Sequence, residues 1–152
     1  MPLPDSAIDA HTAFASLSAL TAFERAVIVD RGVPARLVQR LAAALGVTME
    51  ALCTLIGVRH ATVSRTLKTD SRLSRADSEG AFGMARLIGQ VEQIVQASGD
   101  GTPFDAGRWV AAFLDAPSPA LGGRRPSELM RTSDGRSVVS TLVAQMQSGA
   151  YA

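Results

Sequence analysis

Valine and leucine recur at every fourth position between residues 33 and 45, and this spacing constrains the fold more than any other feature of the sequence. It predicts an amphipathic α-helix whose buried side carries Val33, Leu37, Leu41 and Leu45. Pro34 suits the first turn of that helix, and Gly46 is placed to end it. Because 47% of the 152 residues are apolar, the chain can build a real hydrophobic core from such helices.

Two shorter helical segments follow directly. Thr48 is a plausible N-cap for a helix that contains Met49, Leu52 and Ile56, and Gly57 is placed to end it. Val58 and Arg59 then lead into another helix that continues to about Leu67. Two short helices separated by a glycine turn are typical of a helix-turn-helix, which we place near residues 48–68.

The second of these helices predicts a DNA-reading surface. Val63 and Leu67 share one side and should pack on the preceding helix, which leaves the other side exposed. That side is rich in groups that hydrogen-bond to bases and phosphates, namely Arg59, His60, Thr62, Ser64, Arg65, Thr66 and Lys68. The same composition also suits an ordinary surface helix, or a helix-turn-helix kept only for folding.

The distribution of charge favours a polyanionic partner. The whole chain has a formal net charge of only +1. Between residues 31 and 75, however, eight basic side chains face two acidic ones, a local net charge of +6: Arg31, Arg36, Arg40, Arg59, Arg65, Lys68, Arg72 and Arg75. Such asymmetry indicates that the middle of the chain contacts nucleic acid, although a solvated basic face would look the same.

The rest of the pattern is also helical, so we predict an all-α fold. Residues 13–30 show a helical face, although residues 27–29 are also compatible with a short strand. Ser74 and Asp77 form a weak capping box before a long helix, and three more helices are expected at about 103–115, 125–130 and 134–147. We expect a flexible arm at 1–12, a helical DNA-binding and dimerisation domain at 13–97 and a small C-terminal domain at 98–152.

Catalytic chemistry has little support in the sequence, and we expect neither an enzyme, nor a cofactor, nor a metal site. The only histidines, His11 and His60, lie in the arm and on the DNA-reading helix, and Cys53 between apolar neighbours suits a buried thiol. The sequence lacks metal-ligand spacings and a phosphate-binding loop. It has neither a run of 18 apolar residues nor a signal-peptide pattern, so we expect a cytoplasmic protein without membrane contact.

The most specific pattern lies between Trp109 and Gly149. Trp109, Phe113 and Leu114 should form the inner face of one helix, Gly122 and Gly123 permit a turn with positive φ, and Pro126 opens the next helix. Leu129 and Met130 should pack back onto the core. Gly135 lies at the start of the last helix, whose inner face we expect to be Val138, Val139, Leu142 and Met146.

This stretch resembles the C-terminal domain of the MbcA/ParS/Xre antitoxin family. The family pattern is an aromatic-bearing helix, then Leu-Gly-Gly-x-x-Pro-x-x-Leu-x-x-Thr, a glycine and a final helix. The positions that match it are Trp109, Leu114, Leu121, Gly122, Gly123, Pro126, Leu129, Thr132, Gly135, Val138, Leu142 and Gly149. The similarity is close from about residue 89 to 149, looser back to about residue 32, and absent from residues 1–30.

The resemblance implies an antitoxin of a type II toxin–antitoxin system. Such a protein binds a RES-domain toxin that consumes NAD, blocks its active site with the C-terminal domain, and dimerises and binds its promoter through the N-terminal part. By position, the candidates for toxin contact are Arg124, Arg125, Arg131 and Tyr151, although arginines beside a turn are often only solvated and a terminal tyrosine is often disordered.

Two alternatives to this assignment stay open, one concerning DNA binding and one concerning the function as a whole. The segment from Ala61 to Arg65 only loosely fits the Arg-rich recognition helix that is usual in the family, so promoter binding is less secure than toxin binding. The alternative function is a stand-alone helix-turn-helix regulator whose C-terminal domain only oligomerises.

Overall fold

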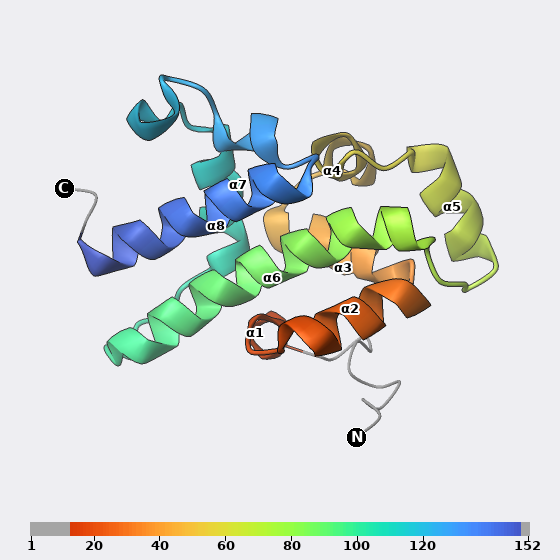
Figure 1. The fold of residues 1–152 in the computed structure, drawn as a ribbon, viewed down its shortest axis with the longest axis horizontal. Coiled ribbons are helices and arrows are strands. Elements are labelled where there is room, and N and C mark those ends of the chain that lie inside the picture. The colour runs from red at the N-terminus through yellow and green to blue at the C-terminus, as the bar shows by residue number, and fades with distance from the viewer. Residues whose placement is uncertain (1–12, 150–152) are drawn as a thin grey trace.

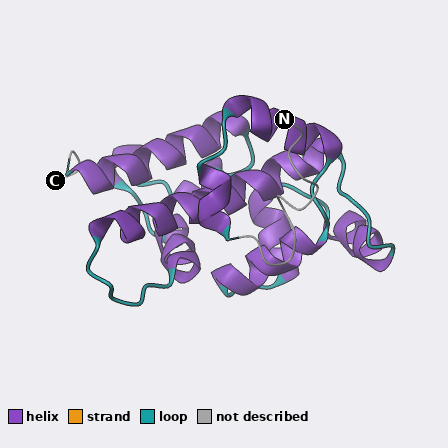
Figure 2. Ribbon diagram, turned by 90° about the horizontal axis from the view of Figure 1, so that it is seen from below, coloured by secondary structure: helices purple, strands orange, loops and turns teal. Residues whose placement is uncertain are grey.

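The computed structural model describes residues 13–149, and within this range every regular element is a helix (Figures 1 and 2). The predicted all-α fold is therefore confirmed. The elements are α1 (Phe14–Ser18), α2 (Ala22–Arg31), α3 (Arg36–Leu45), α4 (Met49–Ile56), α5 (His60–Lys68), α6 (Arg75–Ser98), α7 (Ala106–Asp115), the 3₁₀ helices η2 (Pro119–Leu121) and η3 (Pro126–Leu129), and α8 (Ser133–Ser148).

Helix α6 is the central element of the fold. Its 24 residues make it about 36 Å long, and it packs against α1, α2, α3, α4, α7 and α8 (Figure 1). Its side chains Met84, Ala85 and Ile88 are almost completely buried. This helix thus serves both halves of the molecule, because N-terminal and C-terminal helices pack around the same element.

The buried side chains form one continuous core. It includes Leu41 of α3, Val63 of α5, Val110 of α7 and Val139 of α8, all fully inaccessible to solvent. The proposed domain boundary near residue 98 therefore separates two sequence regions that share a core. That boundary stays a prediction.

The N-terminal segment differs from the single helix expected at 13–30. The structure has two helices here, and neither strand nor bridge occurs at residues 27–29, which lie inside α2. Helix α2 starts at a capping box, in which the Thr21 hydroxyl accepts from the Glu24 backbone N–H at 3.2 Å and the Glu24 carboxylate accepts from the Thr21 N–H at 2.8 Å. The arm predicted at 1–12 lies outside the described residues.

Helix α3 begins two residues later than Pro34 suggested. Pro34 forms an isolated antiparallel bridge with Arg72, and the backbone N–H of Leu73 donates to the Val33 carbonyl at 2.8 Å. The buried Ser78 hydroxyl accepts from the Val33 N–H at 2.9 Å. These bonds fix the chain before α3 to the chain before α6. The predicted glycine ends of α3 and α4 are confirmed, with Gly46 and Gly57 both left-handed.

Three C-terminal expectations need correction. The helix expected at 125–130 is a single 3₁₀ turn, and α7 starts at Ala106, capped by the Asp105 carboxylate, rather than at Pro103. Trp109 is only partly buried, because the inner face of α7 carries Ala106, Gly107, Val110 and Leu114.

The inner face of α8 was also only partly predicted. Val139, Leu142 and Val143 are buried, whereas Val138 and Met146 are 43% and 41% exposed.

Candidate functional surfaces

Helices α4 and α5 have the arrangement of a helix-turn-helix. The Thr48 hydroxyl caps α4 by accepting from the Ala51 N–H at 3.0 Å, and Gly57 ends the helix with a φ of +76°. Val63 anchors α5 in the core with no exposed surface. The side chain of Leu67 is partly buried against the same cluster. The chain therefore turns sharply between the two helices and holds α5 at one end of the molecule (Figure 1).

The predicted DNA-reading side chains all lie on or directly before α5. Arg59, His60, Arg65 and Lys68 are exposed, and Thr62 and Ser64 are partly buried. Thr66 is also partly buried, and its hydroxyl donates to the backbone carbonyl of Thr62 at 2.8 Å. The four exposed residues supply donors for phosphate oxygens and for base edges.

Several of the basic residues counted between 31 and 75 have structural partners instead. Arg36 forms an exposed ion pair with Asp70 at 2.9 Å, and Arg75 forms one with Asp30 at 3.4 Å. The guanidinium of Arg40 lies 4.7 Å from the centre of the Phe14 ring, and that of Arg72 donates to the Gly32 carbonyl at 2.9 Å. The exposed positive charge of the helix-turn-helix is thus concentrated on α5, rather than spread over residues 31–75.

The loop between α7 and α8 is built around Arg125. Its Nε donates to the Asp115 carbonyl at 2.9 Å, and its backbone N–H donates to the Glu128 carboxylate at 2.8 Å. Gly122 and Gly123 have φ values of +67° and +88°, as their predicted turn requires. Arg125 therefore holds the loop in place. Arg124 beside it is exposed and is the candidate for a partner contact.

Arg131, another candidate toxin contact, packs against the helix-turn-helix. The stem of Arg131 lies beside Gly57, and a Cβ built on that glycine would be 3.5 Å from the arginine Cβ. This places Arg131 next to the end of α4, before the first turn of α8. The other end of α8 lies 16 residues away, about 24 Å along the helix, and Tyr151 beyond it lies outside the described residues.

The C-terminal end of α8 exposes an apolar surface that the sequence assigned to the core. Met146 follows Leu142 by four residues and Val143 by three, so all three lie on the same side of the helix. Leu142 and Val143 are 7% and 3% exposed, whereas Met146 is 41% exposed. The last turn of α8 thus extends past the core, toward the opposite end of the long axis from α5 (Figure 1).

A second partly exposed apolar feature lies on α7. The rings of Trp109 and Phe113 stack with their centres 5.1 Å apart and their planes 8° apart. Both side chains contact the core while keeping part of their surface open to solvent. This stacking holds the two side chains in place on the outer face of α7 and leaves that face accessible to solvent.

A metal site and a membrane span are two further possibilities to consider among residues 13–149. No group of three or more histidine, cysteine, aspartate or glutamate side chains there is arranged to hold a metal ion. No single helix in that range is long and apolar enough to cross a membrane, although α3 and α4 together, bent by 101°, pass the same test of length and composition.

Two family models match the chain. The model of the antitoxin Xre-like helix-turn-helix domain matches residues 24–86, and that of the antitoxin Xre/MbcA/ParS C-terminal toxin-binding domain matches residues 102–149. The chain is also 38% identical over 140 residues to the Prs ADP-ribosylating antitoxin of Sphingobium sp. (strain YBL2). That similarity covers 92% of this chain and 88% of the relative.

Proposed function

The chain belongs to the Xre/MbcA/ParS family of antitoxins, and from this premise we propose that it binds an NAD-consuming RES-domain toxin and blocks the active site of that toxin. The resemblance seen in the motif from Trp109 to Gly149 is thereby confirmed. The chain is the antitoxin of a toxin–antitoxin system; the chemistry of the toxin, the blocking mechanism and the repression of the operon are our proposals.

The match of residues 102–149 to a toxin-binding domain is the observation that carries this proposal. Those residues comprise α7, the loop held by Arg125, and α8. Met146 on the last turn of α8 is 41% exposed and offers an apolar anchor for a partner. We propose that this turn and the residues after it, Tyr151 included, enter the mouth of the toxin's NAD pocket, with Arg124 at the rim of the interface.

The name of the Sphingobium relative points to the reaction of the toxin. It links that antitoxin to ADP-ribosylation of Prs. Transfer of ADP-ribose from NAD and hydrolysis of NAD break the same bond, between the nicotinamide and its ribose. We therefore propose that the toxin partner breaks this bond, and that either water or a protein side chain receives the ADP-ribose.

Co-expression tests this proposal. The toxin alone should arrest growth and lower cellular NAD, and the antitoxin should restore both. With purified proteins, free ADP-ribose would indicate hydrolysis, whereas labelled Prs would indicate transfer, and the antitoxin should suppress whichever occurs. Failure of the antitoxin to reduce nicotinamide release at equimolar concentration would refute occlusion of the active site.

We also propose that α5 reads operator DNA and that the chain, as a homodimer within a larger complex in the cytoplasm, represses its own operon. The exposed Arg59, His60, Arg65 and Lys68 support this. Replacing Arg59 and Arg65 with alanine should weaken operator binding about tenfold or more and flatten its salt dependence. Arg124→Ala, in the loop between α7 and α8, is the control and should bind operator normally.

The alternative of a stand-alone helix-turn-helix regulator accounts for the match at residues 24–86 but not for the match to a toxin-binding domain at residues 102–149. It predicts operator binding without any effect on a toxin. The same double variant separates the two: an antitoxin with this division of labour still neutralises its toxin when Arg59 and Arg65 are alanine. We further propose that the chain acts by binding and not by catalysis, so the purified chain should leave NAD intact.

A further inference from the structure

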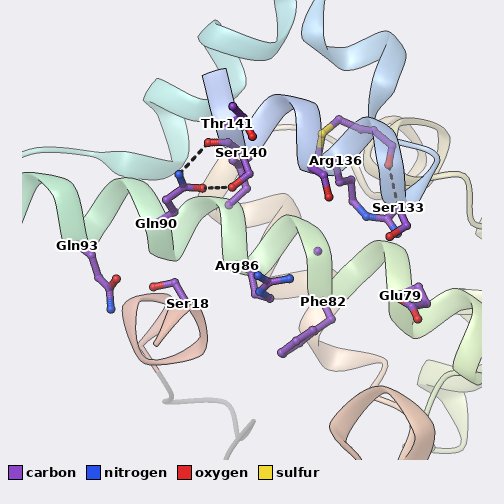
Figure 3. Close-up of a pocket in the computed structure, with 14 residues that line it drawn as sticks. Ser18, Glu79, Phe82, Arg86, Gln90, Gln93, Ser133, Arg136, Ser140 and Thr141 are labelled. Carbon is purple, nitrogen blue, oxygen red and sulfur yellow. Dashed lines mark hydrogen bonds between the residues drawn. The ribbon is translucent and has the colours of Figure 1, made fainter. Parts of the chain in front are cut away.

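A polar groove lies between α1, α6 and α8, on a different part of the molecule from α5 and from the end of α8 (Figure 3). Its volume is about 400 Å³, within the range of small-molecule sites. Hydroxyl groups line much of it, from Ser18, Ser133, Ser137, Ser140 and Thr141. Phe82 and Leu87 supply part of its wall.

Two arginines from different helices meet in this groove. Arg86 comes from the middle of α6 and Arg136 from the first turn of α8. The Nε atom of Arg86 is buried and has no hydrogen-bond partner among the described residues. A buried donor without a partner costs about 1–3 kcal/mol, and more when it is charged, so an acceptor placed there would be strongly favoured.

The structure holds Arg136 in position. Its guanidinium donates to the Met130 carbonyl at 3.0 Å. Its stem crosses α6 above Gly83, where a Cβ would lie only 2.6 Å from the arginine Cδ. Gly83 therefore leaves the space through which Arg136 reaches the groove. Beside it, Gln90 and Ser140 bond to each other across α6 and α8, with the Ser140 hydroxyl donating at 2.8 Å and the Gln90 amide donating to the Ser140 carbonyl at 3.0 Å.

The charges around the groove favour an anion. Burial lowers the pKa of Arg86, and the nearby positive charges of Arg25 and Arg136 lower it further. Burial also lowers the pKa of Arg136, while the carboxylate of Glu79 on the groove wall acts in the opposite direction. Two guanidinium groups and one carboxylate thus line the groove, and the first turn of α8, at the positive end of its helix dipole, forms part of the wall.

We propose that this groove binds a phosphorylated small molecule of the nucleotide class, with its phosphate between Arg86 and Arg136. Guanidinium groups bind phosphate oxygens in a planar, bidentate manner, and a phosphate has enough acceptors for two arginines and a serine hydroxyl together. The volume that remains accommodates more than a lone phosphate ion. Because α6 and α8 both contribute, the bound molecule would tie the toxin-binding helix to the central helix of the fold.

Calorimetric titration of the full chain tests this with AMP, ADP-ribose and inorganic phosphate, against sodium chloride at equal ionic strength. We expect saturable binding of the phosphorylated ligands and none of chloride. Tighter binding of AMP or ADP-ribose than of phosphate would identify a nucleotide as the ligand. Equal or tighter binding of phosphate alone would overturn the nucleotide assignment.

Three variants locate the site. Arg86→Gln should weaken binding by about ten- to a hundredfold, the value of one or two charged hydrogen bonds. Gly83→Ala should weaken it by displacing Arg136 without removing any charge. Ser137→Glu changes an exposed residue of the groove, so it should fold normally while repelling the phosphate, whereas Gln145→Glu, on the same helix outside the groove, should bind normally.

Unchanged nucleotide binding in Ser137→Glu and Gly83→Ala would overturn the proposal. A second result would also overturn it: these variants weaken the toxin complex while no phosphorylated ligand binds the free chain. That result is expected if an acidic side chain of the toxin occupies the groove. The first outcome would not bear on whether the chain neutralises a toxin, because the titration uses the antitoxin alone. The second would leave toxin binding in place and assign the groove to the toxin interface.

Discussion

Gly107 lies where α7 packs on α3, and a Cβ at this position would overlap the backbone carbonyl of Ala44. In an exposed helix, replacing glycine with alanine stabilises by about 0.5–1 kcal/mol. Here we expect the opposite sign, because the two helices must separate, and a loss of about 1–3 kcal/mol in the free energy of unfolding. Urea denaturation of Gly107→Ala measures it. Ala112→Ser, at an exposed position of α7, is the control, and equal stability of the two variants would contradict this contact.

Because of Cys53, the free energy of unfolding should depend on pH. Burial, and to a smaller extent the charge of Asp77, raises the pKa of its thiol above the ordinary value of 9.0. Below the pKa of the unfolded chain both states keep the proton, so the contribution of Cys53 is constant. Above it the unfolded chain releases the proton first, and stability falls as the pH rises through the folded pKa.

Urea denaturation between about pH 8 and pH 10 measures this effect. The wild-type chain should lose stability more steeply over this interval than Cys53→Ala, although the variant starts from a lower value because it leaves a small cavity. Parallel pH profiles for the two chains would show that the thiol titrates alike in the folded and unfolded states.

At the scale of single elements, α8 carries the sharpest test of toxin binding. Met146→Glu places a charge on the exposed apolar side of its last turn and should weaken toxin binding about tenfold or more, with operator binding unchanged. Ala144→Glu adds the same charge at another exposed position of the helix and is the matched control. Measured dissociation constants that rise equally in both variants would exclude a specific role for Met146.

The helices themselves could be predicted because their signals are local. Apolar spacing, Thr48 as a cap and the left-handed Gly46 and Gly57 each act within a few residues, and the structure has all of them. The break before α2 was also visible in principle, since Thr21 and Glu24 have the spacing of a capping box. It was missed because the apolar positions continue across the break.

Burial and pairing over long distances could not be predicted in the same way. Met146 lies on the same side of α8 as the buried Leu142 and Val143. It is nevertheless exposed, because the packing of other elements against α8 ends before the last turn. Similarly, Arg86 and Arg136 are 50 residues apart, and nothing local shows that α6 and α8 bring them together. Of the candidate site residues, those on α5 share one surface because one helix carries them, whereas Arg124 and Arg131 depend on the path of a loop.

For the whole molecule, the separation of α5 from the end of α8 predicts that DNA and toxin bind at the same time (Figure 1). Gel-shift titration should therefore give a slower complex when the toxin is added to antitoxin bound to its operator. The Met146→Glu variant should bind the operator but fail to form the slower complex. Release of free operator on addition of the toxin would instead show that the two partners compete.

The single core that runs from α3 through α6 to α8 limits how this antitoxin can be divided. A gene divided near codon 98 would encode two fragments. In the N-terminal fragment, α6 would lack the C-terminal helices that pack against one of its sides. In the C-terminal fragment, the side chains of Val110, Met130 and Val139 would be exposed to water. Frameshifts and proteases acting there should therefore yield fragments that are degraded rather than half-functional. In a cell that still holds active toxin, damage at one point of the chain would then remove both the neutralisation of the toxin and the proposed repression of the operon.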